Sequence, residues 1–345
     1  MHRAELVAVV LAAVVLAVVF LPGRQGSGSA AALPSIEEPD LNVAVVPTVD
    51  SAGFFIALEQ GLFAKKGLHV TFIPAVSSET VIDAQALMEP RNRVDISCGN
   101  YVSYIEAQQA WNTGQRPSPA EPGVVAADLD IFAEGSVMEA GSQGIYTMPG
   151  SSIRSLADLK GRTVAINAPA NILQLLASSV LAEHGISPKS VHFVTKYNFP
   201  QMPAALQSGA VDAAVLPEPF ASEAQQSLGV TLLADLGQGA TASFPVVGCA
   251  VTQQWAAAHP NTLAAFRAAF EEGQQLADTN RTDVERSMQE LPAPFGVSRD
   301  TAAIMTLNGY PVGAVDPTRL QRVADVMHQF LGFPYFNVAT MLNSN

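Results

Sequence analysis

The sequence predicts an α/β protein of two lobes, each built on a mostly parallel sheet flanked by helices. Apolar, strand-like runs alternate with stretches of helical spacing from Leu41 to Phe132, in the order βαβαβαβ. This alternation is typical of a parallel sheet covered by helices. A second α/β series follows from Gly144 to Leu216, and a strand at Val246–Val251 then returns the chain to the first lobe.

The length of 345 residues is sufficient for two lobes with hydrophobic cores of their own. We predict a linker over residues 33–40, lobe 1 from residues 41–140 plus 247–345, and lobe 2 from residues 141–246. Because the chain passes between the lobes twice, two crossing strands form a hinge, and a hinge of this kind allows closure on a ligand.

The first 32 residues are typical of a targeting segment. Arg3 precedes an apolar run, Leu6 to Leu21, and the triplet Ala30-Ala31-Ala32 resembles a cleavage site. The run has 16 residues, fewer than the roughly 20 of a membrane-spanning helix, which favours a signal peptide over an uncleaved N-terminal anchor. With either, we expect an extracytoplasmic protein, periplasmic or at the cell surface, that contacts the membrane only through this segment.

The charge balance argues against nucleic acid as a partner. The chain has 18 Lys and Arg against 31 Asp and Glu, a formal net charge of −13, and no basic cluster longer than Lys65-Lys66. Phosphate binding requires a basic face. The sequence also contains no H-x-x-x-H, G-x-S-x-G, P-loop or C-x-x-C motif, so we predict neither an enzyme nor a cofactor or metal site.

The first lobe opens with a βαβ unit. A strand at Leu41–Val46 ends at Pro47, helical spacing begins at Phe54, and a second strand reaches Ala75. The elements expected next are a helix at 79–88, a strand at 94–98, a helix at 101–111 and a strand at 124–132. Small ligands collect at the carboxyl ends of such strands, so the turn 48–53 is the first candidate for a binding site.

The second lobe begins after a segment rich in Gly, Ser and acidic residues, 133–143. Ser155 and Asp158 have capping-box spacing at the start of a short helix, which Gly161 ends. We expect strands at 144–148, 163–167, 191–197 and 211–216, a helix from Ile172, and C-terminal helices at 262–278, 300–307 and 317–331, which lie in the part of the chain assigned to lobe 1.

An internal similarity supports two related lobes. The stretch from Ala86 to Asn100 and the stretch from Ala205 to Pro219 follow one pattern, in which a helix end and a turn lead to Val-Asp, an apolar strand and a polar turn. The alternative is chance similarity between two ordinary α/β turns.

Two motifs carry a resemblance to a known family. These are G-L-F-x-x-x-G-L-x-V at Gly61–Val70 and S-I-x-S-x-A-D-L-K-G-x-T-V-A at Ser152–Ala165. They resemble the solute-binding proteins for nitrate, sulfonates, taurine and the thiamine pyrimidine precursor. The resemblance implies a type II periplasmic-binding fold and a monomer that captures a small organic solute by hinge closure. Its partners would be an ABC permease and the ATPase of that importer.

Candidate ligand-binding residues in lobe 1 lie where predicted strands end. Asp50 and Ser51 open the first helix, and both are also good N-cap residues. Asn100 offers a donor and an acceptor, and Tyr101 offers an aromatic face with a hydroxyl. The alternative for the second pair is turn formation and core packing.

Candidates in lobe 2 are Asn167, Asn171 and Glu218. The two asparagines flank a helix N-terminus, where free N–H groups bind polar or anionic groups. Glu218 lies between two prolines that hold it out of regular structure. If Asp50 and Glu218 both face the cleft, they favour an amine-bearing solute, such as an aminopyrimidine or a zwitterion, over a simple oxyanion.

Three alternatives stay open at this point. The fold could serve a pyrimidine-synthase-like enzyme, although the chain has few of the Cys and Lys residues that this resemblance requires. It could also serve a ligand-sensing module for a membrane receptor.

Cys98 and Cys249, the only cysteines, are either buried thiols or a disulfide. The predicted fold places them on neighbouring strands, where disulfide geometry is poorly satisfied.

Overall fold

The structure is a computed structural model that describes residues 35–75, 94–115 and 126–343. The expected targeting segment and the helix expected at 79–88 lie outside these residues. Among the described residues, no helix combines the length and the apolar character needed to cross a membrane.

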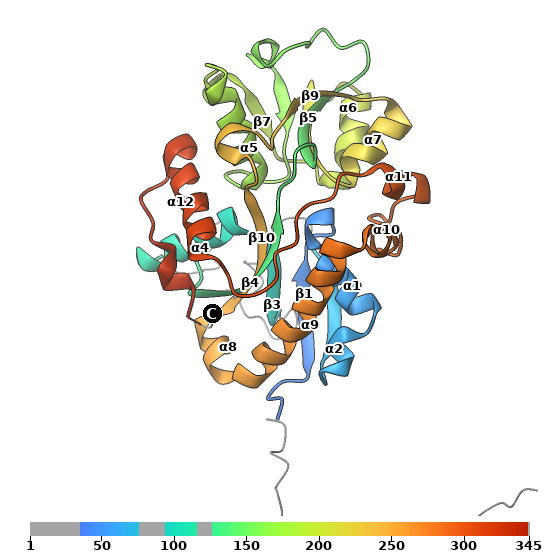
Figure 1. The fold of residues 1–345 in the computed structure, drawn as a ribbon. Helices are drawn as coiled ribbons and strands as arrows, with labels where there is room; N and C mark the ends of the chain where they lie inside the picture. Colours follow the sequence, from blue (N-terminus) through green and yellow to red (C-terminus); the bar gives the residue numbers. More distant parts are fainter. Residues whose placement is uncertain (1–34, 76–93, 116–125, 344–345) are drawn as a thin grey trace, which may run out of the picture. The chain divides into compact units, whose positions relative to one another are not determined.

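The first sheet has five strands in the order β2-β1-β3-β10-β4 (Figure 1). Its strands are β1 (Asp40–Val45), β2 (His69–Pro74), β3 (Ile96–Asn100), β4 (Leu129–Val137) and β10 (Pro245–Thr252). Strand β1 is parallel to β2 and β3, whereas β10 is antiparallel to both of its neighbours. The sheet is therefore mostly parallel, with one reversed strand in fourth place.

The second sheet repeats this plan in the order β7-β6-β8-β5-β9. Its strands are β5 (Gln143–Thr147), β6 (Thr163–Ala165), β7 (His192–Val194), β8 (Ala213–Pro217) and β9 (Thr231–Asp235). Strand β6 is parallel to β7 and β8, and β5 is antiparallel to β8 and β9. We refer to the parts built on the two sheets as lobe 1 and lobe 2.

The reversed strand of each sheet is the one that enters from the other lobe. Strand β5 follows β4 of lobe 1, and β10 follows β9 of lobe 2. Strands β3 and β8, which carry the internal similarity, both take third place in their sheets. The predicted fold class, two mostly parallel sheets joined by two crossing strands, is confirmed.

The helices of lobe 1 that cover the β1 side are α1 (Ala52–Glu59), α2 (Leu62–Lys65), α9 (Pro260–Thr279) and α10 (Arg281–Gln289). Helices α1 and α9 meet at Gly53 and Gly273, where a Cβ on Gly273 would lie 2.2 Å from the Gly53 carbonyl oxygen. Only glycine allows this approach. Phe63 stacks on Phe266 with ring centroids 4.7 Å apart, joining α2 to α9 in the core.

The other helices of lobe 1 are α4 (Tyr101–Asn112), α8 (Gln253–Ala258) and α12 (Pro317–Leu331). Lobe 2 contributes α5 (Ile172–Glu183), α6 (Met202–Gln207) and α7 (Phe220–Leu228). The predicted capping box of Ser155 and Asp158 is present, and it opens a 3₁₀ turn at Leu156–Leu159. Gly161 after this turn has φ of 74°, a conformation that glycine adopts without strain.

The C-terminal helices contact both lobes, whereas the sequence placed them against lobe 1. Helix α11 (Arg299–Ile304) packs on α7, and the Thr301 hydroxyl donates to the Gln226 side chain at 2.7 Å. Helix α12 packs on α5, and Arg322 donates to the carbonyl oxygens of Ala240 and Ala242, each at 2.7 Å. The chain therefore connects the lobes at its C-terminal helices as well as at the two crossing strands.

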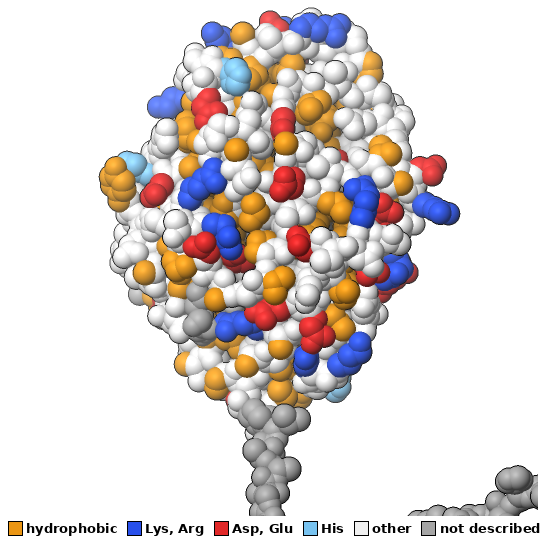
Figure 2. Space-filling model, in the orientation of Figure 1, with side chains coloured by type: hydrophobic (Ala, Val, Ile, Leu, Met, Phe, Trp, Pro, Cys, Tyr) orange, Lys and Arg blue, Asp and Glu red, His pale blue; other side chains and the backbone are white. Residues whose placement is uncertain are grey.

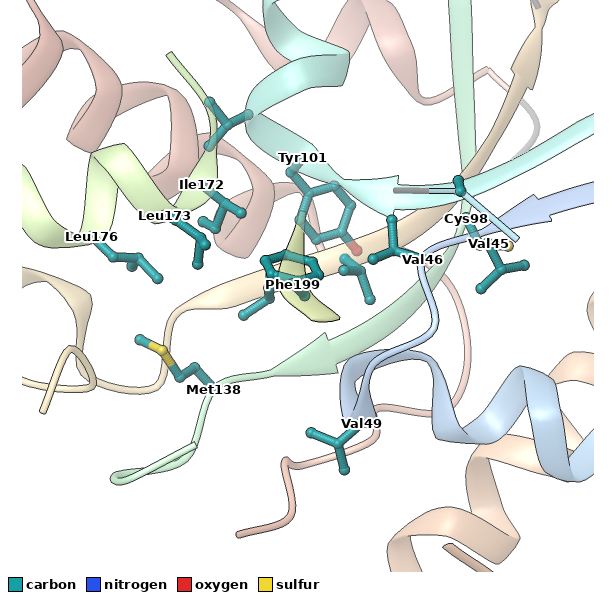
Figure 3. Close-up of a cluster of buried hydrophobic side chains, with 14 of the residues drawn as sticks. Val45, Val46, Val49, Cys98, Tyr101, Met138, Ile172, Leu173, Leu176 and Phe199 are labelled. Carbon is teal, nitrogen blue, oxygen red and sulfur yellow. The ribbon is translucent and has the colours of Figure 1, made fainter. Parts of the chain in front are cut away.

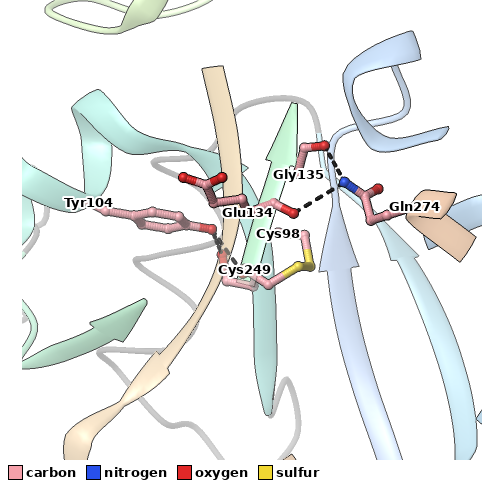
Figure 4. The surroundings of a disulfide bond; sticks show 7 residues. Cys98, Tyr104, Glu134, Gly135, Cys249 and Gln274 are labelled. Atoms are coloured by element: carbon pink, nitrogen blue, oxygen red, sulfur yellow. Dashed lines mark hydrogen bonds between the residues drawn. A yellow bond between two sulfur atoms is a disulfide. The ribbon is translucent and has the colours of Figure 1, made fainter. Parts of the chain in front are cut away.

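Cys98 and Cys249 form a disulfide, which the sequence left open against buried thiols (Figure 4). The two residues are direct partners in the antiparallel register of β3 and β10, with Cα atoms 4.0 Å apart. The argument from strand geometry disfavoured a bridge here. This close antiparallel pairing brings the sulfurs together and ties the returning strand to the centre of the first sheet.

Strand β4 begins and ends later than expected. The sequence analysis assigned residues 133–137 to the connecting segment rich in Gly, Ser and acidic residues, but they continue β4 and pair with β10. Gly135 allows this pairing, because a Cβ there would lie 2.6 Å from the Val247 side chain.

On the face shown in Figure 2, acidic and basic side chains are interspersed over the surface.

Candidate functional site

The candidate site is a cavity between the lobes at the carboxyl ends of their parallel strands. It has about 360 Å³ of empty space, part of it open to solvent. Its lining comes from residues that follow β1, β6 and β7, from the last residues of β3 and β8, and from the two crossing strands β5 and β10. Open α/β sheets place their ligands at this edge.

The greater part of the lining is apolar. Its apolar side chains are Val46, Ile172, Leu173, Phe199, Val246 and Val247, with Pro217 at the end of β8. Figure 3 shows Val46 of lobe 1 facing Ile172, Leu173 and Phe199 of lobe 2. Such a wall binds the apolar part of an organic solute. Of the described lining residues, none is Lys, Arg or His.

Asp50 lines the cavity, but protein donors occupy its carboxylate. Oδ2 accepts from the Thr48 hydroxyl at 3.0 Å, and Oδ1 accepts from the Ser136 hydroxyl at 3.1 Å and from Asn308 Nδ2 at 2.7 Å. Burial raises the pKa of Asp50 despite these three hydrogen bonds. The carboxylate therefore holds the β1 turn, β4 and the C-terminal segment together. Its role toward a ligand stays a prediction.

Ser51 and Tyr101 are buried but are not among the described residues that line the cavity. The Ser51 hydroxyl has no hydrogen-bond partner in the described part of the chain and does not cap α1. The Tyr101 ring packs against Gly248 of β10, where a Cβ would lie 2.5 Å from the ring, and its burial raises the pKa of the phenol. This position of Tyr101 fits core packing, the alternative to ligand binding that the sequence analysis gave, and a contact of Tyr101 with a ligand stays a prediction.

Asn100 and Asn167 both line the cavity, one from each lobe. Asn100 is the N-cap of α4, and its Oδ1 accepts from Ser103 N at 2.9 Å. Asn167 Oδ1 accepts from Asn171 Nδ2 at 2.7 Å, which orients the Asn167 amide. The structure thus brings together three of the seven predicted residues at the cavity: Asp50, Asn100 and Asn167.

Asn171 precedes α5 without capping it by its side chain. Its Oδ1 is buried and has no hydrogen-bond partner among the described residues. Ile172 and Leu173, the first two residues of α5, line the cavity. Because the first N–H groups of a helix have no partner within it, the N-terminus of α5 offers hydrogen-bond donors at the cavity wall.

Glu218 is buried, but it is not among the described residues that line the cavity. Its carboxylate accepts from Ser222 Oγ at 2.8 Å, from Ser222 N at 3.1 Å and from Thr306 N at 3.2 Å, and burial raises its pKa. Its carbonyl oxygen accepts from Val49 N at 3.1 Å. Glu218 thus connects lobe 2 to lobe 1 and to the C-terminal segment. The expectation of an amine-bearing solute required both Asp50 and Glu218 at the cleft, and of these two only Asp50 lines the described cavity.

Gln143 is a candidate that the sequence analysis missed. It is the first residue of β5, lines the cavity and is only 1% exposed. Its Oε1 has no hydrogen-bond partner within the described residues. Buried amides normally have partners, so an unpartnered one at a cavity indicates a ligand-binding group. The signal available in the sequence was its position, a polar residue directly before the strand that enters lobe 2.

Two lobes with this strand order, joined by crossing strands and enclosing a cavity at the facing strand ends, define the type II periplasmic-binding fold. Solved structures agree. The nitrate-binding protein NrtA of Synechocystis has a TM-score of 0.72 at 17% identity, with 89% of this chain and 85% of that chain covered. The alkanesulfonate-binding protein SsuA of Xanthomonas axonopodis has a TM-score of 0.69 at 19% identity, with 89% and 99% covered.

The sequence comparisons are consistent with the fold. The chain belongs to the NMT1-like family, whose model matches residues 35–291. It is 29% identical to the bicarbonate transport ATP-binding protein CmpC of Synechocystis, over 78% of this chain and 39% of that protein. It is 26% identical to the nitrate/nitrite binding protein NrtA of Nostoc, over 72% of this chain and 56% of that protein. The chain thus spans 39% and 56% of the length of these two relatives.

Proposed function

We propose that the protein is an extracytoplasmic solute-binding protein that captures a small organic solute between its lobes and delivers it to an ABC importer. The observation that carries this proposal is the cavity between the lobes, because it combines an apolar wall with a buried amide oxygen, Gln143 Oε1, that has no hydrogen-bond partner among the described residues. The names of the relatives, which include bicarbonate transport, nitrate binding and alkanesulfonate binding, support the transport role.

The hinge supports capture by closure. The strands β5 and β10 that cross between the lobes also line the cavity, through Gln143 and through Val246 and Val247. A rotation about these strands changes the distance between the two halves of the lining, so ligand binding and lobe closure are coupled. An N-terminal export signal and a permease with its ATPase complete the proposed system. No feature of the described residues favours the enzyme or the sensor alternative.

A thermal-shift screen tests the proposal. The purified protein is screened against aminopyrimidines, taurine, alkanesulfonates, nitrate, bicarbonate and a bacterial metabolite extract. A ligand that binds only the folded state stabilises it by about 2.7 kcal/mol at 100 times its Kd, which shifts the melting temperature visibly. We expect at least one such shift.

A cavity-blocking variant locates the binding. Asn167 is half-buried at the cavity wall, so Asn167→Trp places a large ring in the cavity. It should abolish the shift, whereas Gln207→Trp, at an exposed position on α6, should leave it unchanged. A shift that survives Asn167→Trp would place the ligand elsewhere and contradict the proposed site.

A further inference from the structure

The inter-lobe cavity carries more information about its ligand than the proposed function uses. We infer that the cavity selects an uncharged solute with a primary-amide-like or ureide-like group beside an apolar body, and that Gln143 is the residue that recognises the polar group. This inference rests on the proposed function, because it names the class of solute for the same site.

Gln143 is the first reason. Its side chain is 1% exposed, lines the cavity and has an amide oxygen without a partner in the described part of the chain. A primary amide presents one acceptor and two donors in a plane. Its natural complement is another group with an N–H and a C=O side by side, because both halves of each amide are then satisfied.

The charges around the cavity are the second reason. No Lys, Arg or His is among the described residues that line it, and the one ionisable group is Asp50, whose carboxylate accepts from Thr48, Ser136 and Asn308. An anionic solute would lose its hydration without gaining a cation from the described lining, and it would lie near a buried carboxylate. A cationic solute would find that carboxylate already occupied. Both charged classes are disfavoured relative to a neutral one.

The opposite wall supplies the remaining donors. Ile172 and Leu173 begin α5, whose N-terminal N–H groups lack a side-chain cap, and the Asn167 amide is oriented by Asn171 at 2.7 Å. A solute carbonyl can accept from these groups while its N–H faces Gln143. Phe199 and the valines of the lining then contact its apolar body.

Matched pairs of neutral and anionic compounds test the inference. We would measure Kd by calorimetry for benzamide against benzoate, butanamide against butanoate, and butanesulfonamide against butanesulfonate, with nitrate and bicarbonate as simple oxyanions. Within each pair the apolar body is constant, and the polar head changes from a neutral group with N–H donors to an anion that only accepts hydrogen bonds. We expect at least one amide to bind about tenfold or more tightly than its acid.

The variant Gln143→Leu separates recognition from structure. Because the Gln143 amide oxygen has no hydrogen-bond partner among the described residues, this near-isosteric change should not lower the melting temperature of the free protein. It should weaken amide binding about tenfold to a hundredfold. The control Gln225→Leu, at an exposed position on α7, should change neither quantity.

Each outcome decides the question. Tighter binding of the acids, binding of oxyanions alone, or full amide affinity in Gln143→Leu would overturn the inference and leave the solute-binding function standing. If no compound of the pairs binds but a metabolite extract stabilises the protein, the inference is overturned and the solute-binding function stands. If neither the pairs nor the extract bind, the proposed function is overturned as well.

Discussion

Removing the Asp50 carboxylate should destabilise the protein strongly, because it joins three separate parts of the chain. Thr48 from the β1 turn, Ser136 from β4 and Asn308 from the C-terminal segment all donate to it, over 2.7 to 3.1 Å. All four residues are buried. In Asp50→Ala the three donors lose their common acceptor at buried positions.

The magnitude follows from these contacts. A buried donor left without a partner costs about 1–3 kcal/mol, and the two hydroxyls can rotate toward other acceptors, whereas the Asn308 amide is fixed. Relief from burying a carboxylate, whose pKa is raised by desolvation, offsets part of the loss. We therefore expect Asp50→Ala to lower the free energy of unfolding by about 3 kcal/mol.

Asp50→Asn is the matched control, because it keeps one acceptor oxygen for Ser136 and Asn308 and offers an amide N–H₂ to the Thr48 hydroxyl. It should cost about 1 kcal/mol. Urea denaturation of the three proteins at pH 7 measures both values. If Asp50→Ala changes the unfolding free energy by less than about 0.5 kcal/mol, the network does not stabilise the fold. If Asp50→Asn instead abolishes ligand binding at unchanged stability, Asp50 contacts the ligand.

Two further predictions concern the pH dependence of stability and the disulfide. Desolvation raises the pKa of Glu37, but hydrogen bonds from the backbone of Thr262, Asn261 and Glu37 itself and from the Thr262 hydroxyl together outweigh it and lower the pKa to about 2. The carboxylate therefore contributes stability above the unfolded pKa of about 4.5, and this contribution is lost as pH falls toward 2. Glu37→Gln should lower the free energy of unfolding by about 1 kcal/mol at pH 7, as loss of a helix cap does. In thermal melts, the difference in melting temperature between this variant and the unchanged protein should become smaller below pH 4. A difference that does not depend on pH would contradict this prediction. Thiol titration of the unfolded protein should detect no free thiol before reduction and two after it, from Cys98 and Cys249. Because the disulfide joins residues that are 151 positions apart in the sequence, replacing both cysteines by Ala should lower the free energy of unfolding by about 4–5 kcal/mol. Two titratable thiols before reduction would rule the bridge out.

The fold was predictable because each lobe repeats a strongly patterned α/β scheme. The helix expected at 317–331 is α12 with the same bounds, and the strand expected at 246–251 is β10 extended by one residue at each end. The spacing of apolar residues in these segments indicates which face of a helix or strand is buried, and this spacing is present in the sequence itself. Strand β4 was misjudged because Gly135 and Ser136 look like connection residues, and only their pairing with β10 makes them a strand.

The candidate site was predictable only in position. Strand ends and helix starts identified the turns that line the cavity, including Asp50, Asn100 and Asn167. Sequence alone could not show that Glu218 would accept hydrogen bonds from Ser222 and Thr306, because Thr306 lies 88 residues away. It also missed Gln143, whose significance is the absence of a partner in the described structure, and such an absence depends on the complete arrangement around it.

The most direct test of the account is a crystal structure of the protein grown with the compound that raises its melting temperature most. The account predicts ligand density between the lobes, in contact with Gln143 and with the first turn of α5, where Ile172 and Leu173 line the cavity. Density at any other place on the protein, with the inter-lobe cavity holding only solvent, would contradict it.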